Sequence, residues 1–241
     1  MKKNSANLKV WALAALLIAA LMQQGCIGDS NPPPGPEARS EFNFNFNTAG
    51  FVGDVSDFTT ANEDAINFNL DVGPLPSDAN SQGLRLNFTD VGNDVFAYTW
   101  IGIDVLEAST FYNITFEITL EVANMAVDDS ANGAPDEFVH FKAGATGQLP
   151  RRTTDNDFVS VNFDKGADTQ SGGDMLYFGT LTLPEAGAAT GSFTIENFSV
   201  PVFAQTDANG RLYVIFGIEA DANLPISVVI DQMNINYAFA G

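Results

Sequence analysis

Hydrophobic and polar residues alternate along most of the chain after Glu41. The runs at 42–47 (FNFNFN) and 116–122 (FEITLEV) alternate strictly, and shorter runs at 66–70 and 233–237 repeat the pattern. Successive side chains of a β-strand point to opposite faces of a sheet, so this alternation predicts strands with one buried face. Further strand-like runs lie at 84–88, 95–105, 138–142, 158–163, 175–183, 191–200, 212–220 and 226–230.

Clusters of Gly, Asn, Asp and Ser separate these runs, at 91–94, 128–133, 171–174 and 206–210. Such residues tolerate positive φ or bond their own backbone, and they mark turns. Many short strands with frequent turns are typical of a sandwich or barrel. We see no repeat of fixed period, which argues against a propeller or solenoid. The sequence therefore predicts an all-β, two-sheet antiparallel jelly-roll sandwich over residues 41–241.

The N-terminus has the features of an export signal. Three lysines precede an apolar run from residue 10 to residue 22, which is too short to span a membrane but suits a secretory signal. Gly25 and Cys26 follow, and Cys26 is the only cysteine. This arrangement resembles the bacterial lipobox, although Gln23 and Gln24 depart from its usual residues. The resemblance implies a signal peptide over 1–25 and a lipid on Cys26; the alternative is ordinary cleavage with an incidental thiol.

The residues that follow Cys26 indicate where such a lipoprotein would be held. Ile27 stands where an Asp would retain a bacterial lipoprotein at the inner membrane, so the resemblance implies anchoring to the outer membrane. Residues 31–36 (NPPPGP) cannot enter a helix or an inner strand and suit a stiff spacer. We expect 26–40 to be a lipidated N-terminus and proline-rich linker, with the membrane reached through the lipid.

Charge and cysteine content exclude several classes of function. The chain has 10 Lys+Arg against 30 Asp+Glu and a formal net charge of -20, so we expect it to repel nucleic acid. A single cysteine allows no internal disulfide and no cysteine-based zinc site. An acidic exported domain suits neutral sugars or cations as ligands, although solubility alone also explains the charge.

Catalytic motifs are sparse. The chain has no G-x-S-x-G sequence, and its only histidine, His140, lies in an alternating strand where a structural role is the more common one. A pair of carboxylates such as Glu137 and Asp164 could serve a glycoside hydrolase or polysaccharide lyase. Among 30 acids such pairs arise by chance, so an enzyme is the less favoured interpretation.

Two features could bind ligands of other kinds. Loops rich in Asp, Asn and Gly could supply the oxygens that calcium requires, but 128–133 (DDSANG) departs from EF-hand spacing at Ser130, and turn formation explains it equally well. Tyr98 and Trp100 share one strand face with Phe96. That face is either a platform for stacking sugars or, more commonly, part of the core.

Three passages resemble a family of uncharacterised bacterial secreted and lipoprotein domains. They are 133–145, close to G-x-P-G-E-x-V-x-x-K-A-G-A; 161–166, close to N-x-D-K-G; and 207–217, close to G-x-L-W-L-x-V-G. Residues 93–96 are similar to that family's D-D-L-F, while Asp136 and Tyr213 depart from its pattern. More broadly, 111–117 and 229–235 resemble strands of jelly-roll carbohydrate-binding modules. The resemblance implies that Asp231 helps to hold a structural calcium.

The scarce lysines supply the last candidate site. Lys142 and Lys165 lie on or near strands, beside Glu137 and Asp164, and Asp94 falls in another of the family-like passages. These five residues form either a polar ligand pocket or a structural ion-pair cluster. We expect a lipid-anchored envelope binding module, with carbohydrate the favoured ligand and one structural calcium. A structural or protein-interaction lipoprotein of the outer membrane is the alternative, and the oligomeric state stays open.

Overall fold

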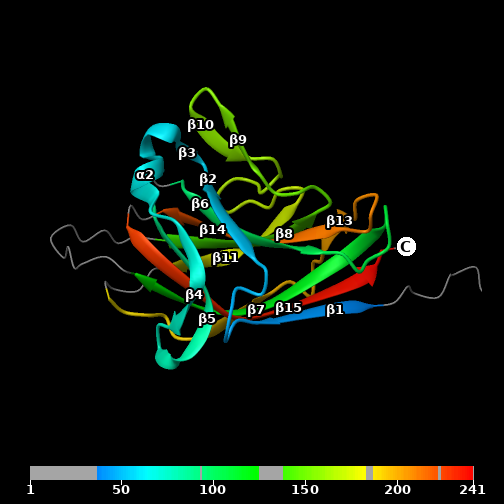
Figure 1. The fold of residues 1–241 in the computed structure, drawn as a ribbon, viewed down its shortest axis with the longest axis horizontal. Coiled ribbons are helices and arrows are strands. Elements are labelled where there is room, and N and C mark those ends of the chain that lie inside the picture. Colours follow the sequence, from blue (N-terminus) through cyan, green and yellow to red (C-terminus); the bar gives the residue numbers. More distant parts are fainter. Residues whose placement is uncertain (1–36, 93, 125–137, 183–186, 222–223, 241) are drawn as a thin grey trace, which may run out of the picture. The chain divides into compact units, whose positions relative to one another are not determined.

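The computed structural model describes residues 37–92, 94–124, 138–182, 187–221 and 224–240. Fifteen β-strands occur in these residues, together with a helical turn η1 (Thr60–Asn62) and a short helix α2 (Glu63–Ile66). The strands form two large antiparallel sheets that lie one over the other (Figure 1). The predicted all-β, two-sheet sandwich is confirmed. Within the described ranges no helix is long and apolar enough to cross a membrane.

The larger sheet is built around its longest strand, β15. Its strands are β1 (Ala38–Asn43), β4 (Asn69–Leu75), β5 (Asp78–Thr89), β7 (Phe111–Asn124), β12 (Phe193–Glu196), β13 (Val202–Gln205) and β15 (Pro225–Phe239). The order is β12-β7-β15-β5-β4, with β13 also on β7. One edge of β15 pairs with β7, and its other edge pairs first with β5 and then with β1. A bulge between Ile230 and Gln232 interrupts the register.

The smaller sheet carries Lys142, one residue of the predicted polar site. Its order is β11-β8-β14-β6-β2. The strands are β2 (Val52–Ser56), β6 (Phe96–Ile103), β8 (Phe138–Thr146), β11 (Met175–Thr182) and β14 (Leu212–Asp221). A third, three-stranded sheet consists of β3 (Phe58–Thr59), β9 (Arg152–Asp155) and β10 (Phe158–Val161), and its β9-β10 hairpin stands out from the sandwich (Figure 1).

The main core lies between the two large sheets, where alternate residues of each strand meet. On β7 the inward residues are at most 1% exposed: Ile114, Phe116, Ile118, Leu120 and Val122. Burial of each such side chain stabilises the fold by about 1.5–3 kcal/mol. The alternation read from 116–122 therefore reports a real difference between the two faces of this strand.

Three predicted strands have different bounds in the structure. β1 begins at Ala38, inside the segment expected to be linker, and stops at Asn43, whose Oδ1 accepts a hydrogen bond from the backbone N–H of Asn45. Ile66 ends α2, because Asn67 takes a left-handed conformation, and β4 starts only at Asn69. The predicted strand at 191–200 is reduced to β12. Residues 1–36, with Cys26 and the predicted signal, lie outside the described residues.

Candidate functional site

A second hydrophobic cluster covers the outer face of the smaller sheet. Phe96 and Tyr98 are fully buried there, whereas the intervening Ala97 faces the main core. The cluster is completed by Phe163, Met175 and Ile215, with the partly buried Trp100 and Val161 packed against it. The Tyr98 ring stacks on that of Trp100 at 5.5 Å and meets that of Phe163 edge-on. The aromatic face of β6 is thus an interior surface beneath the chain that leads from β10 to β11.

A glycine makes this close packing possible. Gly217 on β14 lies directly across from Tyr98 on β6. A Cβ added at Gly217 would come within 2.1 Å of the Phe96 ring. A side chain at this position would therefore displace the aromatic cluster.

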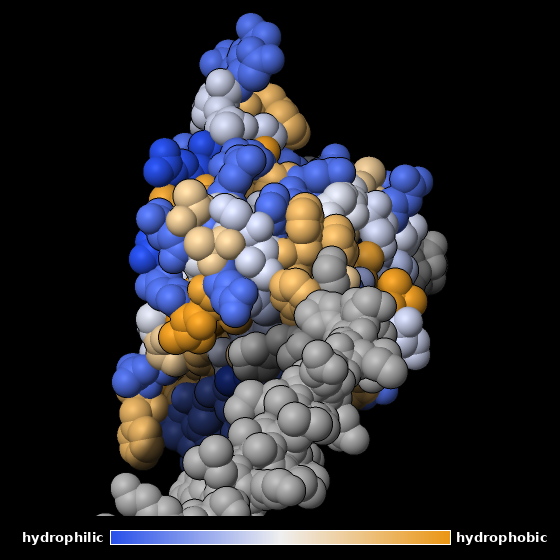
Figure 2. Space-filling view, turned by 90° about the vertical axis from the view of Figure 1, so that its right-hand side faces the viewer, coloured by the Kyte–Doolittle hydropathy of each residue, from blue (hydrophilic) through white to orange (hydrophobic). Residues whose placement is uncertain are grey.

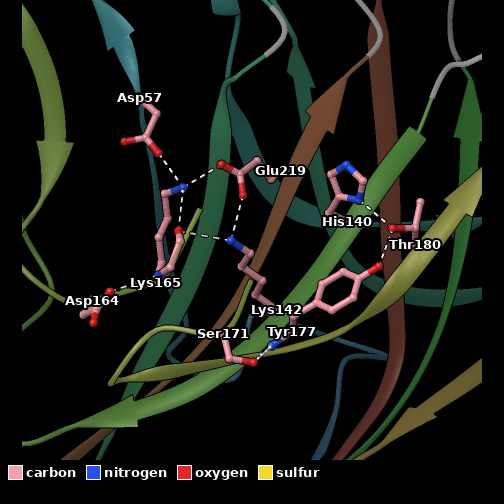
Figure 3. A network of polar contacts seen from close by, with 10 residues as sticks. Asp57, His140, Lys142, Asp164, Lys165, Ser171, Tyr177, Thr180 and Glu219 are labelled. Carbon is pink, nitrogen blue, oxygen red and sulfur yellow. Dashed lines mark hydrogen bonds and ion pairs between the residues drawn. The ribbon is translucent and has the colours of Figure 1, made fainter. Parts of the chain in front are cut away.

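Next to this cluster, two lysines share one buried carboxylate (Figure 3). The Nζ of Lys142, on β8, lies 2.8 Å from Oε2 of Glu219 on β14, and the Lys142 side chain is fully buried. The Nζ of Lys165 lies 2.6 Å from Oε1 of Glu219 and 2.7 Å from Oδ2 of Asp57. Lys142 also donates a hydrogen bond to the carbonyl of Gly166 at 3.2 Å. We call Asp57, Lys142, Lys165 and Glu219 the lysine–carboxylate cluster.

Burial and neighbouring charges act in opposite directions on two members of this cluster. Burial by itself would lower the pKa of Lys165, but the neighbouring Asp57 and Glu219 carboxylates outweigh it and raise that pKa. The pKa of Asp57 is raised, chiefly by burial, against the opposing effect of Lys165. The Nζ atoms of both lysines are therefore already paired with carboxylates. The cluster fits an ion-pair network that fastens the β10–β11 segment to the sheet.

Asp164 organises the loop that carries Lys165. Its carboxylate accepts hydrogen bonds from the backbone N–H of Gly173 at 2.8 Å and of Gly166 at 3.1 Å. These contacts hold the pKa of Asp164 below its usual value. Its own backbone N–H donates to the carboxylate of Asp174. A carboxyl group with a lowered pKa is a poor proton donor at neutral pH, so this geometry suits a structural role better than acid catalysis.

The structure thus brings together part of the predicted polar site. Lys142 and Lys165 meet at Glu219, with Asp164 next to them in the loop. Asp94 is exposed. Its pKa is raised by the partial burial of its carboxyl group and then by the charges of Asp168 and Glu219. Glu137 lies outside the described residues. Sequence reasoning missed Glu219, although a single acid within the apolar run at 212–220 was a usable signal.

A cavity of about 310 Å³ opens at the edge of the sandwich. It lies between β11 and the segment that follows β12, and it is lined by Ser171, Leu176, Tyr177, Phe178, Glu196, Asn197, Phe198, Ser199 and Val200. Phe198 is 50% exposed and Val200 is 62% exposed. The lining combines aromatic rings with hydroxyl, amide and carboxylate groups.

Both walls of the cavity are held by hydrogen bonds. Asn197 accepts one from the backbone N–H of Phe116 at 2.6 Å and donates one to the carbonyl of Val200 at 3.1 Å. On the other wall, the hydroxyls of Tyr177 and Thr180 are 2.5 Å apart, and Thr180 Oγ1 lies 2.6 Å from Nδ1 of His140 (Figure 3). The cavity is thus formed before any ligand arrives, which lowers the entropic cost of binding.

Basic side chains contribute nothing to the cavity lining. Six of the seven lysines and arginines in the described ranges pair with carboxylates: Arg39, Arg85, Lys142, Arg152, Lys165 and Arg211. The lining itself carries one charged group, Glu196. The cavity is therefore suited to neutral or cationic ligands and unsuited to anions.

The calcium prediction at Asp231 stays a prediction. Asp231 falls at the bulge of β15, where burial and then the charge of Glu121 raise its pKa. Glu121 is itself bound by the backbone N–H and the hydroxyl of Ser77. In the part of the chain that the structure describes, no three His, Cys, Asp or Glu side chains gather in a way that could hold a metal ion.

Comparison with solved structures finds distant likenesses. A CBM22-1 xylan-binding domain from Paenibacillus barcinonensis Xyn10C has 11% identity and a TM-score of 0.38, covering 84% of this chain and 95% of that one. TmCBM27, a carbohydrate-binding module described for specific mannan recognition, has 9% identity and a TM-score of 0.39, covering 86% and 99%. The CBM22-1–GH10 modules of Clostridium thermocellum xylanase 10B have 8% identity and a TM-score of 0.38 over 83% of this chain.

This chain spans 28% of the length of that xylanase fragment. No protein-family model and no curated protein matches the sequence. Likenesses with TM-scores this low carry no argument about function.

Proposed function

We propose that the protein is a glycan-binding module of the bacterial envelope, held at the outer membrane by a lipid on Cys26. The observation that supports binding is the preformed cavity at the edge of the sandwich, with aromatic and hydrogen-bonding groups in one lining. The lipid anchor and the membrane are supported by the N-terminal sequence pattern, with its single cysteine after a short apolar run.

The chemistry of the lining suits a sugar. A pyranose ring has an apolar face that packs against an aromatic side chain, and Tyr177 and Phe198 offer such rings. Its hydroxyls need donors and acceptors, which Ser171, Asn197 and Glu196 provide. The cavity volume lies at the lower end of the roughly 300–1,000 Å³ that is typical of small-ligand sites. One or two sugar units of a longer glycan therefore suit it.

Calorimetric titration of the purified full chain in detergent, with soluble oligosaccharides, tests this function. Phe198→Ala removes a ring that is half exposed, so the fold should tolerate the change while glycan affinity falls about tenfold or more. Phe203→Ala is the matched control, because Phe203 is 57% exposed and lies outside the cavity. Absence of binding to every oligosaccharide, or equal loss in both variants, would count against the proposal.

A protein-interaction role is the second candidate, and an exposed aromatic pair favours it. The rings of Phe111 on β7 and Phe203 on β13 stack 4.8 Å apart, although they are 41% and 57% exposed. Phe239, at the end of β15, is 38% exposed. Figure 2 looks onto the end of the molecule near β13, and the hydrophobic residues visible there are interspersed with hydrophilic ones. This pair suits a small contact better than a large interface.

A further inference from the structure

The cavity lining includes one acidic residue, Glu196, that no described lysine or arginine pairs with. Glu196 lines the cavity, and none of the seven described lysines and arginines forms an ion pair with it. The only basic residues outside the described ranges are Lys2, Lys3 and Lys9, which belong to the predicted signal. In the mature chain, a cation that meets Glu196 would therefore come from outside.

A second carboxylate lies directly across from the first. Glu117 on β7 is the cross-strand partner of Glu196 on β12. Like charges directly opposite one another on neighbouring strands destabilise a sheet, whereas opposite charges at the same positions stabilise it. Glu117 receives a long hydrogen bond from the amide of Asn234, at 3.4 Å, and it pairs with none of the described lysines and arginines. The cavity residue Glu196 thus has a second carboxylate as its cross-strand neighbour, at a cost to folding.

The rings beside Glu196 add to the attraction for a cation. Tyr177 and Phe198 line the same cavity, and the negative face of an aromatic ring attracts an ammonium group within about 6 Å. An ammonium group can donate hydrogen bonds to the carboxylate at the same time. A uronic acid would instead bring its carboxylate next to Glu196 with no cation in the lining to pair it.

We propose that the cavity selects sugars with a free amino group, such as the glucosamine units of a deacetylated glycan, over neutral and acidic sugars. This inference rests on the proposed glycan-binding function and names its ligand class. The ammonium group lies between the Glu196 carboxylate and the aromatic rings, and the apolar ring face packs on Phe198. A charge-assisted hydrogen bond is roughly twice as strong as a neutral one. It therefore yields about a tenfold preference over the N-acetylated sugar.

Four oligosaccharides of equal length test the selection by calorimetry on the full chain: glucosamine, N-acetylglucosamine, glucose and galacturonic acid oligomers, at a pH where the amine is protonated. The glucosamine oligomer is expected to bind about tenfold more tightly than its acetylated form. Glu196→Gln should abolish that preference while binding of the glucose oligomer persists. Glu107→Gln removes one exposed charge away from the cavity and should leave the preference intact.

The outcomes distinguish failure of the amino-sugar selection from failure of the proposed glycan-binding function. Equal affinity for the amino, acetylated and neutral oligomers overturns the amino-sugar selection and leaves glycan binding standing. No binding of any oligomer overturns the proposed function itself. Equal weakening by Glu196→Gln and Glu107→Gln shows attraction to the acidic chain as a whole, and it overturns selection by the cavity. A further outcome is that calcium displaces the glucosamine oligomer from the wild-type protein but not from Glu196→Gln. That result would assign the Glu196 carboxylate to a metal ion and would overturn the amino-sugar selection.

Discussion

Glu219 is the residue on which the outer face of the smaller sheet depends. Its side chain is 6% exposed and joins Lys142, on the sheet, to Lys165, in the segment that covers the aromatic cluster. Glu219→Gln leaves two ammonium groups without their shared partner, one of them fully buried. Breaking a buried pair in this way costs about 3–5 kcal/mol.

Urea denaturation checks this value. Glu41→Gln is the control, because the Arg39–Glu41 pair is more than half exposed on both sides and should contribute at most about 1 kcal/mol. A loss of about 1 kcal/mol or less in Glu219→Gln would show that the lysine–carboxylate cluster does not fasten the segment.

The Asp164 loop should give the protein a specific sensitivity to acid. Hydrogen bonds from the Gly173 and Gly166 backbone hold the folded-state pKa of Asp164 below its unfolded value. The ionised group therefore adds stability above the unfolded pKa of about 3.9, and this stability is lost as the pH falls through the folded pKa. In Asp164→Asn the melting temperature should be lower at neutral pH and should fall less between neutral and acid conditions. An unchanged acid slope would contradict this.

At the scale of single elements, the segment after β12 decides the shape of the cavity. The Asn197 side chain bonds the backbone of Phe116, Ile114 and Val200 at the point where the pairing with β7 is interrupted between β12 and β13. Asn197→Ala should cost about 1–3 kcal/mol, because it leaves half-buried backbone groups unpaired. It should also weaken glycan binding, because the wall that carries Phe198 loses its support. Asn45→Ala, at an exposed turn, is expected to change neither; hydrogen exchange at Phe116 and Val200 supplies the local readout.

The same element shows what sequence reasoning reached and where it stopped. Alternation along β7 predicted a strand with one buried face, because burial on one face produces a pattern among residues that are adjacent in the sequence. The predicted strand at 191–200 instead breaks at Asn197, whose partner Phe116 is 81 positions away and leaves no local signal. The scarcity of basic residues identified Lys142 and Lys165. Their shared partner, Glu219, lies on β14 and is distant from both in the sequence. Tyr98 and Trp100 were placed on one face correctly, yet the segment that covers that face could not be read from their spacing.

At the scale of the whole molecule, the charge balance and the proposed lipid anchor determine which ligands and surfaces the protein encounters. Nearly all described cations are paired, so the surface presents excess carboxylates to its surroundings. Cys26→Ser should move the protein from the membrane fraction to the soluble fraction of exporting bacterial cells, because the lipid is the proposed means of attachment. Fractionation with immunoblotting measures this. Unchanged membrane association would contradict lipid anchoring.

Calcium offers a further test at this scale. If a structural ion binds near Asp231, saturating calcium at 100 times its dissociation constant should stabilise the fold by about 2.7 kcal/mol. Asp231→Asn should remove that gain, while Asp78→Asn, at the exposed start of β5, should keep it. A melting curve that does not change when calcium is added would contradict the proposal of a structural ion.

The central claim is that a glycan binds in the cavity at the edge of the sandwich. Nuclear magnetic resonance tests this claim most directly, because it maps the residues that the ligand contacts. The measurement is a series of 1H–15N spectra of the full chain during titration with a glucosamine oligomer. We predict saturable shifts concentrated at residues 171–178 and 196–200, with Phe111 and Phe203 unmoved. Shifts that gather around Phe111 and Phe203, or no saturable shift at all, would contradict the account.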